Sequence, residues 1–217
     1  MSPVSPDLLR ERLELADELL ARRAQMFQPQ DLPGRYGRVV KAIDRVLEAI
    51  QTEAVLGGGW AVWHHGFVGR ITQDIDLALP ANMVDEFLRA ASVAGFDPLP
   101  IQAGRWPKLL HRETKIQVDI LPEGARPGTR SHPAPTLIPH PSKMGATGPA
   151  LRYITLPALI ELKLAAGRAR DESDVVELIR TNGDKVETIR KHLADVHSDY
   201  AAAFDRLVER AQEQRDE

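Results

Sequence analysis

Apolar residues along the first fifty positions recur every three or four residues, over 6–27 and again over 39–50. This spacing places them on one face of a helix. The first segment begins with Ser-Pro-Asp, an order typical of a helix start, and the helix-breaking sequence PQDLPG separates the two. The pattern predicts a helical N-terminal lobe over residues 1–53.

From Ala54 the hydrophobic period changes from helical to alternating. AVL ahead of three glycines predicts a short buried strand, and DIDLALP at residues 74–80 alternates strictly and ends in proline. The sequence KLLHRETKIQVDILP predicts two more strands joined by a tight turn, over roughly 107–112 and 115–121. WAVWHHG predicts a helix after the glycines, and Asn82 is placed to cap another helix that stops before FDP.

Residues 122–149 contain seven prolines and four glycines and show no periodicity. A loop of this length in a compact domain is uncommon unless it is functional or mobile. After it the sequence predicts a short strand, a helix capped by Thr155 and three further helices. The fold class expected is α/β (α+β): a small mixed sheet flanked by helices, with its core at 54–150 and a helical C-terminal region at 151–217.

The composition is that of an ordinary globular protein, with 43% hydrophobic and 27% charged residues and no cysteine. The sequence shows neither the apolar core of a signal peptide nor a run of membrane-spanning length, so we expect a cytoplasmic protein without a membrane partner. The net charge is −3, but residues 105–152 contain eight Lys or Arg and three acids, a local charge of +5. We expect this basic segment to meet a polyanion.

Asp74 and Asp76 alternate with aliphatic residues, so their carboxylates share one face of the predicted strand. Their Cα atoms would lie roughly 7 Å apart, close enough for both to bind one divalent cation. Asp119 takes the equivalent position in a later strand. If the two strands are neighbours, three carboxylates converge, as in sites where two Mg²⁺ ions align an attacking oxygen and stabilise a leaving pyrophosphate. The alternative is a solvated strand end.

Gly58 and Gly59 separate a strand from a helix, where backbone N–H groups allow a phosphate to approach without a Cβ in the way. The alternative is a plain tight turn. No Gly-Lys-Ser/Thr follows, and the spacing is not that of the dinucleotide fingerprint, so the glycines belong to neither of those motifs.

The stretch GGWAVWHHGFVGRITQDIDLAL resembles the signature of the polymerase-beta-type nucleotidyltransferase superfamily. Within it, the resemblance is to AbiEii/MenT-type proteins, many of them toxins of toxin–antitoxin pairs. Arg70 and Thr72 precede the Asp-x-Asp pair as in that pattern. A second stretch, LPALIELKLAAGRARDESDVVEL, is similar to the family's helix with a lysine, here Lys163, and its following Arg-Asp-x-x-Asp, which here ends at Asp174. The two matches span roughly 54–180.

The resemblance implies the nucleotidyltransferase fold and an enzyme that uses an NTP with Mg²⁺ or Mn²⁺. It implies that Asp74 and Asp76 bind the metals, with Asp119 as third ligand or general base and Lys163 completing the catalytic set. It further implies nucleotide contacts by six residues: Gly58, Gly59, Arg70, Thr72, Lys163 and Asp174.

Two departures from the family pattern bear on activity. Where the commoner motif has a serine that contacts phosphate, this chain has Trp60, and some branches of the family lack a third acid such as Asp119. The sequence is therefore also compatible with a catalytically weak or inactive binding module. Such a module would keep the fold and act as a toxin–antitoxin or regulatory partner.

Lys163 lies among aliphatic residues of a predicted helix, and a buried ammonium needs a partner. One hypothesis is that Lys163 meets the nucleotide phosphates with Asp174 as its partner, and the other is that its side chain extends to solvent. His64 and His65 lack zinc-ligand spacing, and we expect one to be packed and the other near the pocket. Trp106 is a candidate for base stacking or for the core.

The basic segment 105–152 favours an RNA acceptor, with the 3′ end of tRNA as the leading candidate and a protein hydroxyl as the alternative. A toxin would also have a cognate antitoxin protein as partner. An aminoglycoside-type resistance enzyme uses the same chemistry. Its cationic acceptor would need an acidic pocket, and the local charge of +5 argues against that.

Overall fold

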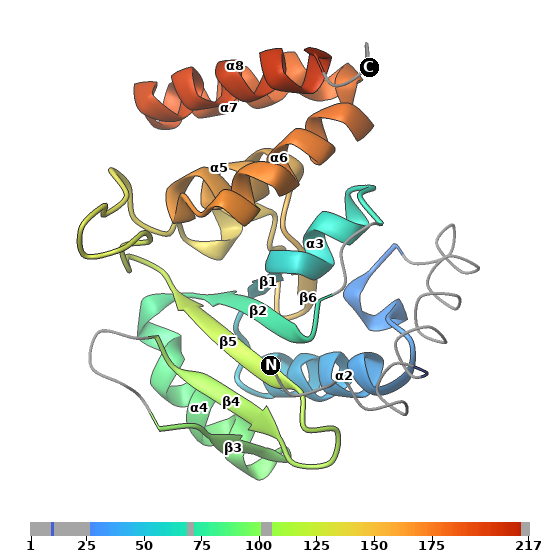
Figure 1. The fold of residues 1–217 in the computed structure, drawn as a ribbon. Coiled ribbons are helices and arrows are strands. Elements are labelled where there is room, and N and C mark those ends of the chain that lie inside the picture. Colours follow the sequence, from blue (N-terminus) through green and yellow to red (C-terminus); the bar gives the residue numbers. More distant parts are fainter. Residues whose placement is uncertain (1–9, 11–26, 69–71, 101–105, 214–217) are drawn as a thin grey trace.

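The centre of the protein is a six-stranded mixed sheet, seen in a computed structural model that describes residue 10 and residues 27–68, 72–100 and 106–213 (Figure 1). The strands are β1 (Ala54–Leu56), β2 (Asp74–Leu79), β3 (Phe96–Pro98), β4 (Lys108–His111), β5 (Gln117–Pro122) and β6 (Leu151–Tyr153). Their order across the sheet is β3-β4-β5-β2-β1-β6. The β1–β6 and β2–β5 pairs are parallel and the others antiparallel. The predicted mixed sheet is confirmed.

Helices cover the sheet and continue beyond it. The α-helices are α2 (Gly34–Ala49), α3 (Gly58–His64), α4 (Val84–Val93), α5 (Leu156–Ala166), α6 (Ala169–Thr181), α7 (Val186–Val196) and α8 (Ser198–Glu213). Short 3-10 helices are η2 (Pro29–Asp31), η3 (Ala81–Met83), η4 (Pro141–Met144) and η5 (Gly183–Lys185). The four helices predicted after the long loop are all present, whereas the first predicted helix lies outside the described residues.

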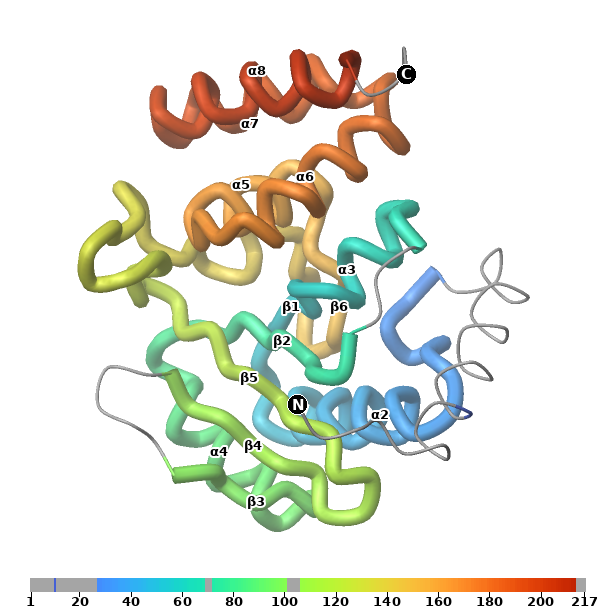
Figure 2. The backbone as a smooth tube through the Cα atoms, viewed as in Figure 1, coloured from blue at the N-terminus to red at the C-terminus, as the bar shows by residue number. Residues whose placement is uncertain are grey.

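The helices form two groups, which the tube view separates clearly (Figure 2). α2 and α4 pack together against the sheet, and α5–α8 form a layer of their own on the side where α3 lies (Figure 1). Val39 and Ile43 of α2 are fully buried in the same core as Ile75 and Leu77 of β2. No helix of the described part is long and apolar enough to cross a membrane.

The alternation predicted for β2 is present in its first four residues, where Asp74 and Asp76 are half-buried and Ile75 and Leu77 fully buried. It is lost at the end of the strand, where Ala78 and Leu79 are both buried. The predicted cap at Asn82 is wrong. Asn82 lies inside η3, and α4 begins after Met83 without a side-chain cap. The strand β3 was not predicted, since three residues are too few to show a period.

The Pro/Gly segment 122–149 is partly packed against the rest of the protein. At its base the backbone N–H of Gly124 donates to Ile138 O, and that of Ile138 donates to Ala125 O, both at 2.9 Å. Ile138 and Met144 are 2% and 0% exposed. The segment is therefore anchored at its base and at η4, and residues 126–129 are held between these anchors.

Candidate active site

The three aspartates proposed as metal ligands lie on two neighbouring strands, β2 and β5. Asp76 of β2 is the Cα partner of Asp119 of β5, and Asp74 is the partner of Gln117. The three aspartates are half-buried and alternate with buried aliphatic residues on both strands. The condition set for this site is therefore met: β2 and β5 are adjacent and in the register that brings Asp76 opposite Asp119.

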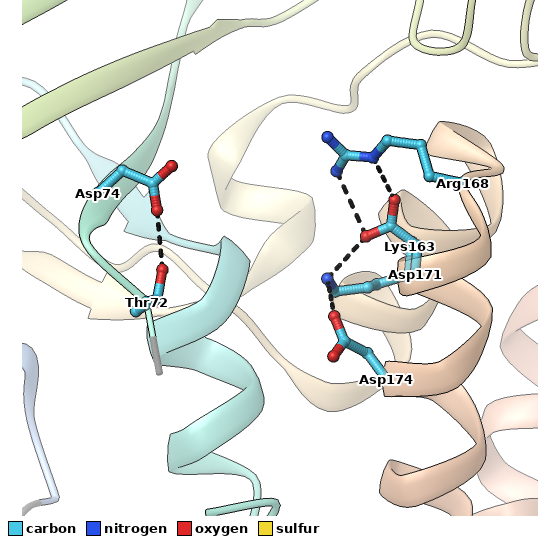
Figure 3. A network of polar contacts seen from close by, with 6 residues as sticks. All are labelled: Thr72, Asp74, Lys163, Arg168, Asp171 and Asp174. Carbon is cyan, nitrogen blue, oxygen red and sulfur yellow. Dashed lines mark hydrogen bonds and ion pairs between the residues drawn. The ribbon is translucent and has the colours of Figure 1, made fainter. Parts of the chain in front are cut away.

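Polar neighbours hold two of these carboxylates. Thr72 Oγ1 donates to Asp74 Oδ1 at 2.8 Å (Figure 3). Lys108 Nζ donates to Asp119 Oδ2 at 2.6 Å, and Gln117 Nε2 donates to Asp119 Oδ1 at 2.5 Å. Within the described ranges, no three His, Asp or Glu side chains are grouped so that they could hold a metal ion. A metal site shared by three aspartates stays a prediction. It requires the Asp119 carboxylate to give up its ion pair with Lys108 and bind the metal ion instead.

Two glycines at the start of α3 make this arrangement sterically feasible. A Cβ on Gly58, whose φ is +58°, would lie 1.6 Å from Asp76 Oδ2. A Cβ on Gly59 would lie 2.5 Å from the Cβ of Thr72. Glycine is needed at both positions because side chains of the β2 region occupy that space. The predicted phosphate contacts of the glycines stay a prediction.

Lys163 is the centre of a buried ion cluster. Its side chain is 5% exposed, and Nζ donates to Asp171 Oδ1 at 2.8 Å and to Asp174 Oδ2 at 2.5 Å (Figure 3). The expected partnership with Asp174 is present, and Asp171 is a second partner that the sequence reasoning did not assign. The alternative in which Lys163 extends to solvent is wrong, because α6 closes over the ammonium group.

Arg168 continues this cluster toward the surface. Its Nε donates to Asp171 Oδ2 at 2.5 Å, while its own side chain is 71% exposed. Burial alone would raise the pKa of Asp171, but the Arg168 hydrogen bond and the Lys163 charge outweigh burial and lower it. The pKa of Arg168 is raised, chiefly by the hydrogen bond to Asp171 and further by the negative charges of Asp171 and Asp76. The family motif contains Arg170, whereas the contact with Asp171 is made by Arg168, two residues earlier.

A cavity of about 420 Å³ lies between the aspartates of β2 and β5 and the ion cluster around Lys163, and residues of both groups line it. Its charged lining residues are Asp76, Lys108, Asp119, Arg126, Lys163, Arg168 and Asp171. Its larger apolar lining residues are Trp106, Ile120, Leu121, Ile138, Leu159 and Leu162. Gly58 also lines the cavity, whereas Gly59, Thr72, Asp74 and Asp174 are not among its lining residues. Arg70 lies outside the described residues.

The aromatic residues of α3 face away from this cavity. Trp60 is 2% exposed and packs against Tyr36 with ring centroids 4.6 Å apart. His64 stacks on Tyr153, and His65 Nε2 lies 2.7 Å from Ile154 O. The expectation that one histidine lies near the pocket is wrong, because both are used to pack α3 on β6. Trp106 does line the cavity, so its side chain is available to a ligand there.

Comparison with known proteins points to the same class of enzyme as the sequence motifs. The model of the aminoglycoside-2''-adenylyltransferase family matches residues 39–122, from within α2 to the end of β5. This match bears out the predicted class, a nucleotidyltransferase. It supports the superfamily rather than the AbiEii/MenT type that the sequence motifs suggested.

Two solved structures align with most of the chain. One is the crystal structure of ANT(2")-Ia in complex with adenylyl-2"-tobramycin, at 17% identity and a TM-score of 0.44, covering 82% of this chain and 97% of that one. The other is the solution structure of the antibiotic-resistance factor ANT(2'')-Ia, at 18% identity and a TM-score of 0.40, covering 82% and 92%. Likenesses at this level do not equate individual residues. No curated protein matches the chain.

Proposed function

We propose that the protein transfers a nucleoside monophosphate from an NTP to a hydroxyl group of a small polyhydroxylated acceptor. The observation that supports this most directly is the facing of Asp76 and Asp119 at a cavity whose lining also contains apolar residues and cations. Apolar lining that includes Trp106 suits a nucleobase, and exposed cations such as Arg168 suit phosphates.

The residues of this face fit a divalent cation. Carboxylate oxygens are the ligands that Mg²⁺ and Mn²⁺ prefer, and the absence of a Cβ at Gly58 leaves Asp76 its position at the cavity. Asp74 and Asp76 would hold the ion, which when bound neutralises charge on the phosphates. Thr72 fixes the orientation of the Asp74 carboxylate through its hydrogen bond.

In the proposed reaction the acceptor oxygen attacks the α-phosphorus, its proton passes to a carboxylate, and the bond to pyrophosphate breaks. Asp119 is our candidate for the proton acceptor, because it lines the cavity opposite Asp76. Lys108 and Gln117 orient the Asp119 carboxylate. Arg168 is placed to bind the leaving phosphates.

A small acceptor is favoured because the charges of the basic segment do not all meet at the cavity. Lys108 and Arg126 line it together with Asp76 and Asp119, whereas Arg112 pairs with Asp97 and lines a different cleft. The local charge of +5 is therefore not a continuous basic surface, and the charge argument against an aminoglycoside-type acceptor loses much of its force. The name of the matched family indicates aminoglycosides as the first class to test.

An RNA acceptor, with or without a toxin role, is the second candidate. Arg130 and Lys143 are exposed on the loop whose residues 126–129 line the cavity. These two side chains could bind phosphates of an RNA whose 3′ end enters the cavity.

The test is incubation of the protein with each NTP, Mg²⁺ and either tobramycin or total tRNA, with pyrophosphate release and the mass of the acceptor as readouts. We expect a gain of one nucleotide mass on the small acceptor, absent with Asp76→Asn. Labelled tRNA with unmodified tobramycin would overturn the small-acceptor proposal. Nucleotide binding without release of pyrophosphate with any acceptor would instead support the inactive binding module.

A further inference from the structure

A second concave site lies at the opposite end of β4 from the proposed active site. The cleft has a volume of about 360 Å³ and is formed by α2, the end of α4 and the turn between β4 and β5. It shares no lining residue with the first cavity. Lys108 at the start of β4 lines the first cavity, and His111 at its end lines the cleft.

Positive charge dominates the cleft. Arg38, Lys41 and Arg45 project from successive turns of α2, and Arg112 faces them from the β4–β5 turn. Glu113 is the single acid of the lining, so the four cations exceed it by three charges. His111 adds none at neutral pH, because its burial lowers the pKa of the imidazole.

Two of these cations are already paired, and two have no acidic partner among the described residues. Arg38 Nε lies 3.2 Å from Glu113 Oε1. Arg112 pairs with Asp97 and also donates to the backbone carbonyl of Ser92 at the end of α4. Within the described part of the chain, Lys41 and Arg45 form no ion pair, and Arg45 Nε donates only to the backbone carbonyl of Lys41.

We propose that this cleft binds a compact phosphorylated anion: pyrophosphate or the phosphate chain of a nucleotide. Lys41 and Arg45 lie one helical turn apart and would bind the phosphate oxygens by charge-assisted hydrogen bonds. Arg38 would turn from Glu113 to the anion, since exposed ion pairs of this kind contribute little. The cations surround one cleft rather than forming a track, which favours a compact ligand over an extended nucleic acid. The proposal does not depend on the proposed transferase activity.

The experiment is calorimetric titration of the full-length protein with pyrophosphate in EDTA, repeated with ATP to separate the two sources of the phosphate chain. We compare the wild type with Lys41→Gln/Arg45→Gln and with a matched control, Lys191→Gln/Arg206→Gln, which removes the same charges from exposed positions on α7 and α8. Thermal melting checks that all variants are folded.

We expect affinity for pyrophosphate to fall at least about tenfold in Lys41→Gln/Arg45→Gln, because two charged hydrogen-bond donors are lost, and to be unchanged in the control. Lys108→Gln, which alters the first cavity, should also leave this affinity unchanged. Equal affinity in Lys41→Gln/Arg45→Gln and wild type would overturn the proposal, as would a loss confined to Lys108→Gln. Binding of a single-stranded RNA but not of pyrophosphate or ATP would also overturn it.

Discussion

The two ion clusters around the cavity use the same chemical groups in opposite ways. On the β2–β5 face, Asp76 and Asp119 are half-buried and line open space, and the Lys108 that pairs with Asp119 is 39% exposed. In the α5–α6 cluster, the side chains of Lys163, Asp171 and Asp174 are between 2% and 5% exposed. Charge alone therefore does not indicate which acidic residues are available to a ligand.

Burial decides how much each cluster contributes to stability. A partly exposed pair is screened by water and contributes little to the free energy of unfolding. Removing one member of a buried pair leaves an unpaired charge in a medium of low dielectric. The first cluster is thus suited to exchanging partners during a reaction, and the second to holding α5 and α6 in place beneath Arg168.

The comparison predicts its largest effect for Asp76→Asn. Losing one metal-binding carboxylate should lower turnover about 10³-fold or more, because metal-ion catalysis supplies several kcal/mol of transition-state stabilisation. The melting temperature should change little, since Asp76 lines open space. Activity assays and thermal melting of the same preparation check both expectations. A large loss of stability with retained turnover would assign Asp76 to the fold.

Lys163→Met should lower the free energy of unfolding strongly, unlike Asp76→Asn. It removes the cation between two buried carboxylates, and we expect a loss of about 3–5 kcal/mol in the free energy of unfolding, measured by urea titration. The control is Lys163→Met/Asp174→Asn, which removes one of the stranded charges and should be more stable than the single variant. If the single variant melts like the wild type but binds NTP more weakly, Lys163 acts on phosphate rather than on the fold.

His65 tests whether burial has the same effect on a group outside both clusters. Burial lowers its pKa to about 4, whereas the unfolded chain takes up the proton near pH 6.5. The unfolded state then binds more protons between these values, so stability falls as the pH drops through this window, by on the order of 3 kcal/mol in total. In His65→Gln this part of the pH dependence should be absent. Unfolding curves at pH 7, 5.5 and 4.5 compare the two, and identical slopes would contradict the prediction.

Gly58→Ala should destabilise the fold less than Lys163→Met and should also lower activity, by less than Asp76→Asn does. The substitution strains a residue at φ +58° by about 1–2 kcal/mol and displaces the Asp76 carboxylate. Turnover should fall about tenfold, since a small misplacement of a catalytic group is costly. Gly57→Ala is the matched control, because φ is −105° there and a Cβ would lie 3.9 Å from the nearest atom. Equal activity of the two variants would show that the close approach at Gly58 is unimportant.

Local patterns in the sequence determined the elements and the chemistry of the first cluster. The alternation in DIDLAL places Asp74 and Asp76 on one face whatever the rest of the chain does, because side-chain direction in a strand has a period of two. The strand, glycine pair and helix at 54–64 and the four C-terminal helices follow from equally local spacing. The enzyme class was accessible for the same reason, since its motifs are short and contiguous.

Tertiary structure alone decided which charged groups meet and which are exposed. Strand register brings Lys108 next to Asp119. Helix packing brings both Asp171 and Asp174 to Lys163. The packing of α3 on β2 places Gly58 against Asp76, where a Cβ would not fit. The sequence placed a single basic region at 105–152, whereas the folded chain divides its charges between two sites: Lys108 and Arg126 line the cavity, and Arg112 joins a basic cleft formed with α2. A linear charge count cannot show this, because the field at a site depends on distances and burial in three dimensions.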